Sequence, residues 1–496
     1  MAIDFQRIVF FGDSLTDNGN LPEPVRPDPP YVGGRFTNGP VYAEVLAQEL
    51  GIVVNDVAFG GAEASTESGD NVAQKAINLS SQVSNYLGDS PFPFSSGEDI
   101  LPGTAASILI GGNDVLNEKP ATRAEAIDLS NRVVASIDAA VVDLAQAGVS
   151  HVVLYTLPNV TDAPRAQALS PAQRVLDDQF VAATNQGIKA IAAGAAGSVV
   201  TTVVDLNRLE AEIRNDRETF GLKVLETPLF NKVGDTLVST GITSQVSASQ
   251  VAFFDPLHPT KIVHAIIGAF SEATLKADLT VLRGGTANVI AGSNGIDLVL
   301  AGGGADRVSG AAGDDVLLGG NGNDRVNGGT GNNLASGGSG DDVIIGKSGI
   351  DVLAGNLGND TISGGGGGDV LIGGAGGDVI FGQGGHDLFV FSGDGLGNGF
   401  DQVFGGSGID TLRLNVSRGL FDSAEFKSEL AAYASLLDSG SGATFTFADL
   451  DLAVTGIERL EVRVGGKVVY TDGHAAVAQF AARAALMHDA DLWGFL

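Results

Sequence analysis

Short apolar runs alternate with longer amphipathic stretches over the first 279 residues of the chain. The runs are rich in Val, Ile and Phe, as expected of strands buried on both faces of a parallel sheet. They cover residues 7–13, 52–59, 106–112, 151–157 and 198–204. Helical patterns lie between them, near residues 39–50, 71–87, 122–147 and 171–194. This alternation predicts an α/β fold, in which helices cover both faces of one parallel sheet.

Three polar or glycine-rich turns follow directly on predicted strands. They are "GDS" at 12–14, "FGGA" at 59–62 and "GGND" at 111–114. In open parallel sheets the chemistry lies beyond the carboxyl ends of the strands. We therefore expect these turns to gather at one edge of the sheet.

A nine-residue period replaces the alternation from residue 284 onwards. Glycine stands two residues before each repeated acidic position, and an apolar residue stands two residues after it, from Val299 to Phe389. The acidic positions are Asp297, Asp306, Asp315, Asp324, Asp342, Asp351, Asp360, Asp369, Asp378 and Asp387. Asparagine takes the same position at Asn333 and at Asn288. A register held over so many units indicates a stack of repeated structural units.

The last part of the chain returns to an ordinary composition. It contains a predicted helix at 423–437, short strands and a terminal apolar stretch at 475–487. The chain is too long for one ordinary domain. We predict three regions: a first domain at 1–279, a repeat domain at 280–412 and a C-terminal cap at 413–496.

The charge is strongly negative and unevenly distributed. The 59 acidic and 28 basic residues give a formal charge of −31. Residues 284–412 contain fifteen aspartates and no glutamate. Such a field repels nucleic acid and anionic membranes and attracts cations. The chain has no cysteine, which excludes disulfides and thiolate metal sites.

The N-terminus shows no basic leader, and the longest uncharged stretch, 190–204, is only fifteen residues long. A membrane-spanning helix needs about 20 apolar residues. We therefore expect a soluble protein that binds no nucleic acid and inserts into no membrane.

A serine and a histidine far apart in the chain are candidates for nucleophilic catalysis. A serine hydroxyl attacks an ester when a base takes its proton and donors stabilise the oxyanion. His258 stands three residues after Asp255 and between two prolines. This spacing lets Asp255 accept from one ring nitrogen while the other faces Ser14. Taken alone, an Asp-Ser pair after a strand is most often a turn or a helix cap, and Asp-x-x-His is often only a capped helix start.

Five sequence blocks together resemble the GDSL, or SGNH, hydrolases. "FGDSLTDNGN", "GRFTNGPVYAEVLA", "NDVAFGGA", "LIGGND" and "DPLHPT" occur in the order and spacing of that family, over residues 5–275. The resemblance implies a three-layer, flavodoxin-like α/β/α fold. It implies Ser14 as nucleophile, His258 as general base and Asp255 as its orienting partner. The implied oxyanion donors are the Ser14 amide, the Asn113 side chain and the Gly61 amide, with Gly60 as the alternative glycine. No Gly-x-Ser-x-Gly elbow occurs in the chain.

The regular aspartates require a counter-charge. Neighbouring strands lie ~4.8 Å apart, so stacked carboxylates repel one another by roughly 1 kcal/mol or more per pair. Calcium prefers oxygen-rich sites of carboxylates and carbonyls. A disordered linker is the alternative interpretation, but the strict apolar position argues against it.

The period resembles the RTX nonapeptide repeat. The resemblance implies a parallel β-roll in which positions 18 residues apart stack in two rows, with several structural calcium ions. Sites at Asn288 and Asn333 are then weaker or absent. RTX proteins are similar in carrying an uncleaved C-terminal signal read by type I secretion machinery, which implies an extracellular protein. The end of the chain, "DADLWGFL", resembles such a signal and is also compatible with a cap on the roll.

The leading hypothesis is a secreted, calcium-stabilised serine esterase or lipase that hydrolyses small-molecule or lipid esters. Residues 21–34 and 205–250 are the segments most free to shape a pocket, and the latter is moderately apolar. This mildly favours acyl chains over sugars. Carbohydrate deacetylase and phospholipase activity are alternatives on the same fold. A calcium-dependent surface protein with an inactive hydrolase domain is an alternative of another class.

Overall fold

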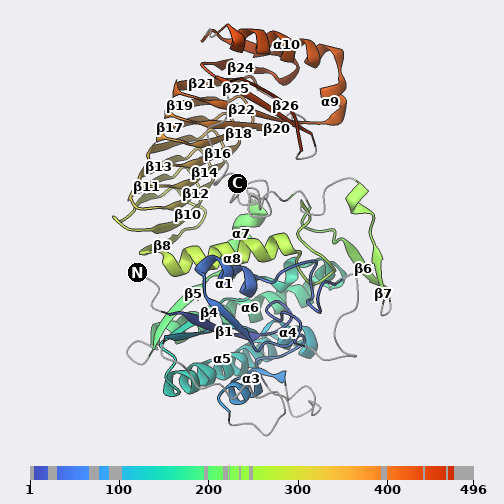
Figure 1. Ribbon diagram of the computed structural model, residues 1–496. Helices are drawn as coiled ribbons and strands as arrows, with labels where there is room; N and C mark the ends of the chain where they lie inside the picture. The colour runs from blue at the N-terminus through green and yellow to red at the C-terminus, as the bar shows by residue number, and fades with distance from the viewer. Residues whose placement is uncertain are drawn as a thin grey trace. The chain divides into compact units, whose positions relative to one another are not determined.

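The structure is a computed structural model. It describes residues 5–20, 31–65, 77–88, 103–194, 199–215, 222, 224–233, 236–244, 250–392, 399–439, 442–464 and 467–473. The chain forms two compact units, one of residues up to 214 with 221–276, and one that contains 277–490. Figure 1 shows the elements of both units. Among the described residues, no helix is both long and apolar enough to cross a membrane.

The first unit is built on a five-stranded parallel sheet of order β2-β1-β3-β4-β5. Its strands are β1 (Arg7–Gly12), β2 (Val53–Asp56), β3 (Thr104–Leu109), β4 (His151–Tyr155) and β5 (Val200–Val204). All five lie inside or beside the predicted apolar runs. The predicted α/β class is therefore confirmed, and the strand order is that of flavodoxin-like folds.

Helices cover both faces of this sheet (Figure 1). They are α1 (Tyr42–Leu50), α3 (Leu79–Tyr86), α4 (Gly112–Glu118), α5 (Arg123–Gln146), α6 (Pro171–Gly194), α7 (Leu206–Asn215) and α8 (Lys261–Lys276). Successive residues of β1 point to opposite layers. The Phe11 ring meets Tyr86 of α3 edge to face at 5.7 Å, and the Phe10 ring meets Tyr42 of α1 at 6.1 Å. Burial on both faces explains why the strands read as continuous apolar runs.

The strand order creates a switch point between β1 and β3. The chain passes from β1 to β2 on one side and then returns to β3 on the other side of β1. Connections leave the carboxyl ends of β1 and β3 in opposite directions, which opens a crevice there. The turns that carry Ser14 and Asn113 follow these two strands.

The second unit is a stack of parallel strands in two sheets. One sheet has the order β26-β25-β22-β20-β18-β16-β14-β12-β10-β8, and the other has β23-β24-β21-β19-β17-β15-β13-β11-β9. The repeat strands are β8 (Leu279–Leu282), β9 (Val289–Ala291), β10 (Asp297–Gly303), β11 (Arg307–Ala312), β12 (Val316–Asn321), β13 (Arg325–Thr330), β14 (Leu334–Ser339), β15 (Val343–Ser348), β16 (Val352–Leu357), β17 (Thr361–Gly367), β18 (Val370–Ala375), β19 (Val379–Gly385), β20 (Leu388–Ser392), β21 (Asp401–Gly408) and β22 (Thr411–Val416).

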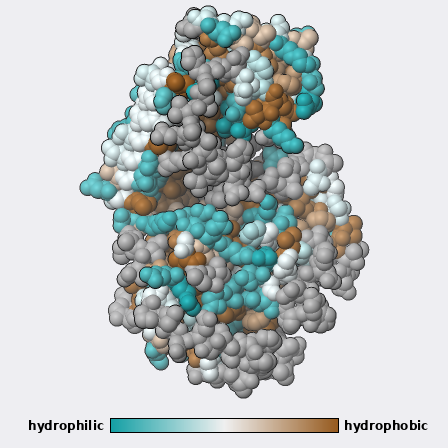
Figure 2. All heavy atoms as spheres, viewed as in Figure 1, coloured by the Kyte–Doolittle hydropathy of each residue, from teal (hydrophilic) through white to brown (hydrophobic). Residues whose placement is uncertain are grey.

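The nine-residue period becomes this stack because two units make one turn. Leu298 pairs with Val316 and Arg307 with Arg325, which are shifts of 18 residues. The apolar position of each unit points into the interior, where Val299 and Phe389 have 0% exposure. In Figure 2, pale and teal atoms accordingly cover most of the visible face of the stack. The expected β-roll is therefore confirmed.

The glycine two residues before each acidic position has a structural reason. From Gly304 to Gly385 these glycines have φ between 104° and 150°, a region that L side chains rarely adopt. A side chain at Gly313 would also collide with the backbone of Gly295 in the preceding turn of the stack. The repeat therefore needs glycine both for its turn and for close stacking.

The C-terminal segment continues the stack. It contains α9 (Arg418–Asp422), α10 (Ala424–Asp438), β23 (Phe445–Phe447), β24 (Leu452–Thr455), β25 (Arg459–Val464) and β26 (Lys467–Gly473). α10 coincides with the helix predicted at 423–437. β22 runs through position 412, where we predicted a boundary, and pairs with β20 and β25. The exact limits of the three predicted regions stay predictions.

Candidate active site and candidate calcium sites

Ser14 lies in a tight turn immediately after β1. The Asp13 carbonyl accepts hydrogen bonds from the amides of Thr16 and Asp17, which closes the turn. Asp13 is itself buried, and its Oδ1 accepts from the Leu15 amide at 3.0 Å. Burial raises the pKa of the Asp13 carboxyl to about 7. The turn thus fixes Ser14, 7% exposed, at the carboxyl edge of the sheet.

The structure brings Ser14, His258 and Asp255 together from positions 244 residues apart. Nε2 of His258 lies 3.0 Å from Oγ of Ser14, and Nδ1 lies 2.8 Å from Oδ2 of Asp255. An ionised carboxylate only accepts hydrogen bonds, so Nδ1 carries the ring hydrogen. Nε2 is then left as an acceptor for the serine hydroxyl. This series can transfer a proton from the hydroxyl to the imidazole.

Asp255 is held by four hydrogen bonds. Its Oδ1 accepts from the amides of Leu257 and His258, and its Oδ2 accepts from His258 Nδ1 and from the Tyr31 hydroxyl at 2.5 Å. Burial alone would raise the pKa of Asp255. Hydrogen bonds and charge from His258, together with the Tyr31 hydrogen bond, lower it to about 2. Asp255 is therefore ionised throughout the neutral pH range.

The loop that carries His258 is fixed by packing and by its backbone. The Phe36 ring lies 5.0 Å from the imidazole at 30°. The Phe254 amide donates to the His258 carbonyl at 2.8 Å, and the Arg165 amide donates to the Pro256 carbonyl at 2.8 Å. These contacts restrain the loop on both sides of His258.

The candidate oxyanion donors come from two further turns. Asn113 lies in the first turn of α4 and donates from Nδ2 to the Ala62 carbonyl at 2.9 Å. An amide nitrogen carries two hydrogens, so this bond uses only one of them. Gly60, the alternative glycine, donates its amide to Oδ2 of Asp17 at 2.8 Å. Gly61 is exposed and has φ of 81°.

Buried carboxylates that the sequence reasoning missed hold these turns in place. Asp17 accepts from the amides of Gly19, Asn20 and Gly60, and so ties the turn after β1 to the turn after β2. Asp114 accepts from the amides of Ala64 and Ser65 and from the Ser65 hydroxyl. Asp17 ends the motif "GDSLTD" and Asp114 ends the motif "GGND", and this position beside the candidate site residues could have indicated their role.

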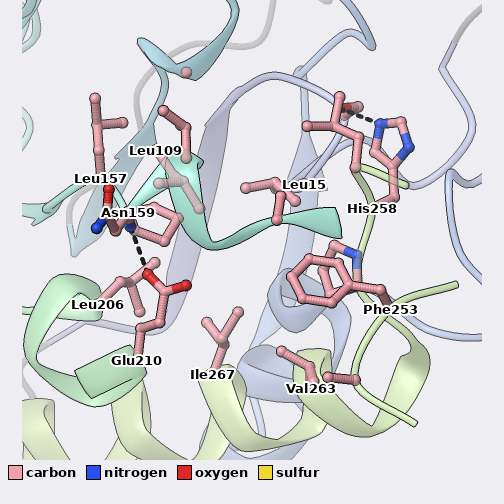
Figure 3. Close-up of a pocket in the computed structure, with 18 of the residues that line it drawn as sticks. Leu15, Leu109, Leu157, Asn159, Leu206, Glu210, Phe253, His258, Val263 and Ile267 are labelled. Carbon is pink, nitrogen blue, oxygen red and sulfur yellow. Dashed lines mark hydrogen bonds between the residues drawn. The ribbon is translucent and has the colours of Figure 1, made fainter. Parts of the chain in front are cut away.

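An apolar pocket opens beside Ser14 and His258 and includes Asn113 in its lining. Its described lining does not include Gly61. Its other walls are mostly aliphatic and aromatic side chains, namely Leu15, Leu109, Leu116, Leu157, Val160, Leu206, Leu209, Ile213, Leu225, Phe253, Leu257, Val263 and Ile267. Figure 3 shows Leu15 and Ile267 between His258 on one side and Glu210 on the other. Six lining residues come from the segment 205–250, which was expected to shape a pocket, and residues 21–30 of the other such segment lie outside the described residues.

The far side of this pocket carries a polar group. Oε2 of Glu210 accepts from the Asn159 amide at 2.5 Å, and Oε1 lies 3.7 Å from the Arg214 guanidinium. Arg214 also pairs with Asp162 at 2.9 Å. Burial, reinforced by the charge of Asp162, raises the pKa of Glu210 to about 8. At neutral pH this carboxyl is therefore mainly uncharged.

The repeated aspartates form two rows in the roll. The amide of each donates to Oδ1 of the residue at the same position in the next turn, as from Asp324 to Asp342 at 2.6 Å, and Asp315 donates in this way to Asn333. The second oxygen, Oδ2, has no hydrogen-bond partner among the described residues at Asp306, Asp315, Asp324, Asp351, Asp360, Asp369, Asp378 and Asp387. Burial raises the pKa of Asp360 and Asp369 to about 7. Buried anionic oxygens without partners fit a site for a hard cation.

Backbone oxygens converge on the same points. A Cβ atom built on Gly310 would collide with Oδ2 of Asp315 and lie 2.6 Å from the Gly328 carbonyl oxygen of the next turn. A Cβ atom built on Gly355 would likewise lie close to two oxygens, namely Oδ2 of Asp360 and the carbonyl oxygen of Gly373. No three His, Cys, Asp or Glu side chains cluster among the residues that the structure describes. Each of these points offers a carboxylate and backbone carbonyls as ligands, which suit calcium. Bound calcium would neutralise the negative charge of the rows.

Asn333 changes the row at its position. Its Nδ2 donates to Oδ1 of Asp351 at 3.0 Å and occupies the place where an aspartate would present Oδ2, beside Gly328. An N–H group there repels a cation. This geometry supports the expectation of a weak or absent site.

Two members of the rows were missed by the sequence analysis. The Asp378 amide donates to Oδ1 of Asp401, and the Asp387 amide donates to Oδ1 of Asp410. Both steps span 23 residues instead of 18. The motif "GGSGIDTLRL" around Asp410 repeats the pattern and could have marked it.

A parallel sheet of this order, with a hydrogen-bonded serine, histidine and carboxylate at its switch point, defines the SGNH type of hydrolase fold. Residues 8–270 match the GDSL-like Lipase/Acylhydrolase family, and the chain belongs to this family. Residues 283–317, 318–353, 354–389 and 397–415 match the RTX calcium-binding nonapeptide repeat. Both resemblances inferred from the sequence are thereby confirmed.

Three curated relatives are similar to part of the chain. Phosphatidylcholine-sterol acyltransferase of Aeromonas hydrophila is 27% identical over 316 residues, which cover 53% of this chain and 88% of the relative. Thermolabile hemolysin of Vibrio parahaemolyticus is 26% identical over 278 residues, covering 53% and 62%. A secreted effector protein of Salmonella typhimurium is 28% identical over 190 residues, covering 36% and 41%. The matches thus span less than two thirds of the last two relatives.

Proposed function

We propose that the protein hydrolyses carboxylic esters of small to medium acyl groups, with Ser14 as nucleophile, His258 as general base and Asp255 as the group that orients it. The observation that carries this proposal is the 3.0 Å contact between Ser14 Oγ and His258 Nε2 at the mouth of an apolar pocket. Family membership supports the reaction class. Aliphatic walls favour an acyl chain over a sugar, because they offer a polyol few hydrogen-bond partners.

The proposed reaction has two half-reactions. Ser14 Oγ attacks the ester carbonyl while its proton moves to His258 Nε2, and the imidazolium is stabilised by ionised Asp255. The oxyanion accepts hydrogen bonds from the Ser14 amide, the Gly61 amide and Asn113 Nδ2. His258 then returns the proton to the departing alcohol, which leaves an acyl-serine. Water repeats the sequence and releases the carboxylic acid.

The proposed substrate class is tested by a panel of p-nitrophenyl esters with acyl chains of two to twelve carbons, beside acetylated polysaccharide and phospholipid. We expect the highest kcat/KM on a short or medium acyl ester. A higher value on acetylated polysaccharide would establish the deacetylase alternative, and a higher value on phospholipid would establish the phospholipase alternative.

Replacing Asn113 by alanine is expected to lower kcat by roughly 10²–10³, with little change in KM, because an oxyanion donor acts in the transition state. Steady-state kinetics on p-nitrophenyl butyrate measure this. The matched control is Asn117→Ala on the same helix, whose side chain is exposed and donates to Glu63. Equal losses in both variants would show that the effect is structural and not catalytic.

The pocket carboxyl predicts a pH dependence that differs between substrates. Since the pKa of Glu210 is about 8, the group is neutral below this pH and charged above it. A charged carboxylate disfavours an apolar chain beside it. The octanoyl-to-acetyl ratio of kcat/KM should therefore fall as pH rises from 7 to 9.5.

Any pH dependence that the two substrates have in common cancels in the octanoyl-to-acetyl ratio of kcat/KM. Glu210→Gln keeps an acceptor for the Asn159 amide but cannot ionise, so its ratio should stay level over the same range. A wild-type ratio that does not change with pH would exclude a role of Glu210 in chain binding.

We further infer that the protein acts outside the cell after type I secretion, with calcium bound to the roll. The RTX repeats and the similarity to a secreted effector protein support this inference. The stretches 475–487 and 489–496, which carry the proposed signal, lie outside the described residues. Calcium at the two rows would supply positive charge to the carboxylates, while the ester chemistry uses the side chains around Ser14.

A further inference from the structure

One row of carboxylates continues past the nonapeptide repeats into the C-terminal segment. The Asp387 amide donates to Oδ1 of Asp410 at 2.9 Å, and the Asp410 amide donates to Oε2 of Glu458 at 2.8 Å. β22 pairs with β25 so that Thr411 lies opposite Arg459. Glu458 therefore takes the register position of the next aspartate, with Gly456 two residues before it and Leu460 two residues after it, as in the repeats.

The oxygen arrangement of the repeats is reproduced at this last position. A Cβ atom built on Gly405 would lie 2.6 Å from Oδ2 of Asp410 and would collide with the carbonyl oxygen of Gly456. This is the same pair of oxygens as at Gly310, but the carbonyl now comes from the C-terminal segment. Asp410 has 0% exposure, and its Oδ2 has no hydrogen-bond partner among the described residues.

We propose that Asp410 Oδ2 and the Gly456 carbonyl oxygen bind one further calcium ion, which ties residues 442–464 to the end of the roll. The ion neutralises a buried carboxylate whose Oδ2 has no hydrogen-bond partner among the described residues. Glu458 positions Asp410 by accepting a hydrogen bond from its amide, as an aspartate or asparagine side chain does in each earlier turn of this row. Calcium binding thus stabilises a segment that lies beyond the last matched repeat at 415.

The other row ends differently. The Asp401 amide donates to the Asp451 carbonyl, and Leu452 lies opposite Asp401 in the register of β21 and β24. No acidic side chain therefore occupies the next register position of that row in the described residues. We therefore expect a calcium site at the C-terminal end of only one of the two rows.

The experiment compares Asp410→Asn with Asp438→Asn in the full-length protein at saturating calcium. Asp438 is exposed at the end of α10, so its replacement removes the same charge outside the site. Bound calcium is counted by equilibrium dialysis with atomic absorption. Hydrogen exchange of β24 and β25 reports the attached segment, and exchange of β13 to β15 reports the earlier turns.

We expect Asp410→Asn to bind one ion fewer than the control. Protection of β24 and β25 should fall about 10-fold at a calcium concentration ten times the dissociation constant, while β13 to β15 keep theirs. Equal ion counts with equal protection in both variants would overturn the proposal. Loss of protection in β13 to β15 as well would also overturn it, because the proposed ion attaches only the last segment.

Discussion

Replacing Ser14 by alanine is expected to lower kcat for p-nitrophenyl butyrate by a factor on the order of 10⁴–10⁶, because the acyl-serine can no longer form. His258→Ala should cost a similar factor, and the double variant should cost little more than either one, since the side chains act as a unit. The thermal midpoint should hardly change, because only a hydroxyl is removed. Initial rates, corrected for uncatalysed hydrolysis, and a melting curve measure both quantities.

The matched control is Ser136→Ala on α5, whose hydroxyl donates to the Arg132 carbonyl in the same helix and is outside the pocket lining. This variant should keep wild-type kcat. If wild type and Ser14→Ala hydrolyse every ester of the panel equally slowly, the enzyme interpretation is wrong. The alternative of a calcium-dependent surface protein with an inactive hydrolase unit would then hold.

The elements of the hydrolase unit could be predicted because its strands are buried on both faces. Residues such as Phe10 and Phe11 must both be apolar, since each packs against a different helical layer. The pairing of Ser14 with His258 could be proposed because few histidines occur and one has an aspartate three residues before it. Chain order places Ser14 at the sheet edge where parallel strands end, because it follows directly on β1.

Tyr31 could not be predicted as the second donor to Asp255. Its hydroxyl reaches Oδ2 across a sequence separation of 224 residues, from a segment without periodicity. Nothing local in the sequence sets where that segment lies. Glu210 is similar, because its carboxyl enters the pocket only through the packing of α7, whereas an exposed helical glutamate has the same sequence pattern.

The roll could be predicted in detail because its interactions repeat with the sequence. A shift of 18 residues fixes both the strand register and the stacking of the aspartates. The same reliance on period explains why Asp401 and Asp410 were missed. A step of 23 residues leaves the stack intact, because the Asp378 amide still donates to Oδ1 of Asp401 and β19 still pairs in parallel with β21.

Removing calcium with a chelator is expected to unfold the roll. Without a cation, folding buries rows of carboxylates, most of whose Oδ2 atoms have no hydrogen-bond partner among the described residues. Burial raises the pKa of Asp315 and Asp324 to about 6. Keeping these two carboxyls ionised at neutral pH therefore costs the folded roll free energy. Each site saturated at a hundred times its dissociation constant contributes about 2.7 kcal/mol. A few such sites equal the ~5–15 kcal/mol that stabilises an ordinary domain.

Far-ultraviolet circular dichroism should therefore lose β signal on chelation and regain it at ~10⁻⁴–10⁻³ M calcium. Magnesium at equal concentration should restore little, because it requires octahedral geometry and retains its waters. Ester hydrolysis should continue in the chelated protein, because the pocket residues run from Asp13 to Ile267 and belong to the first unit. An unchanged β signal in chelator would contradict the calcium sites. Loss of hydrolysis in step with the β signal would show instead that the roll supports the fold of the hydrolase unit.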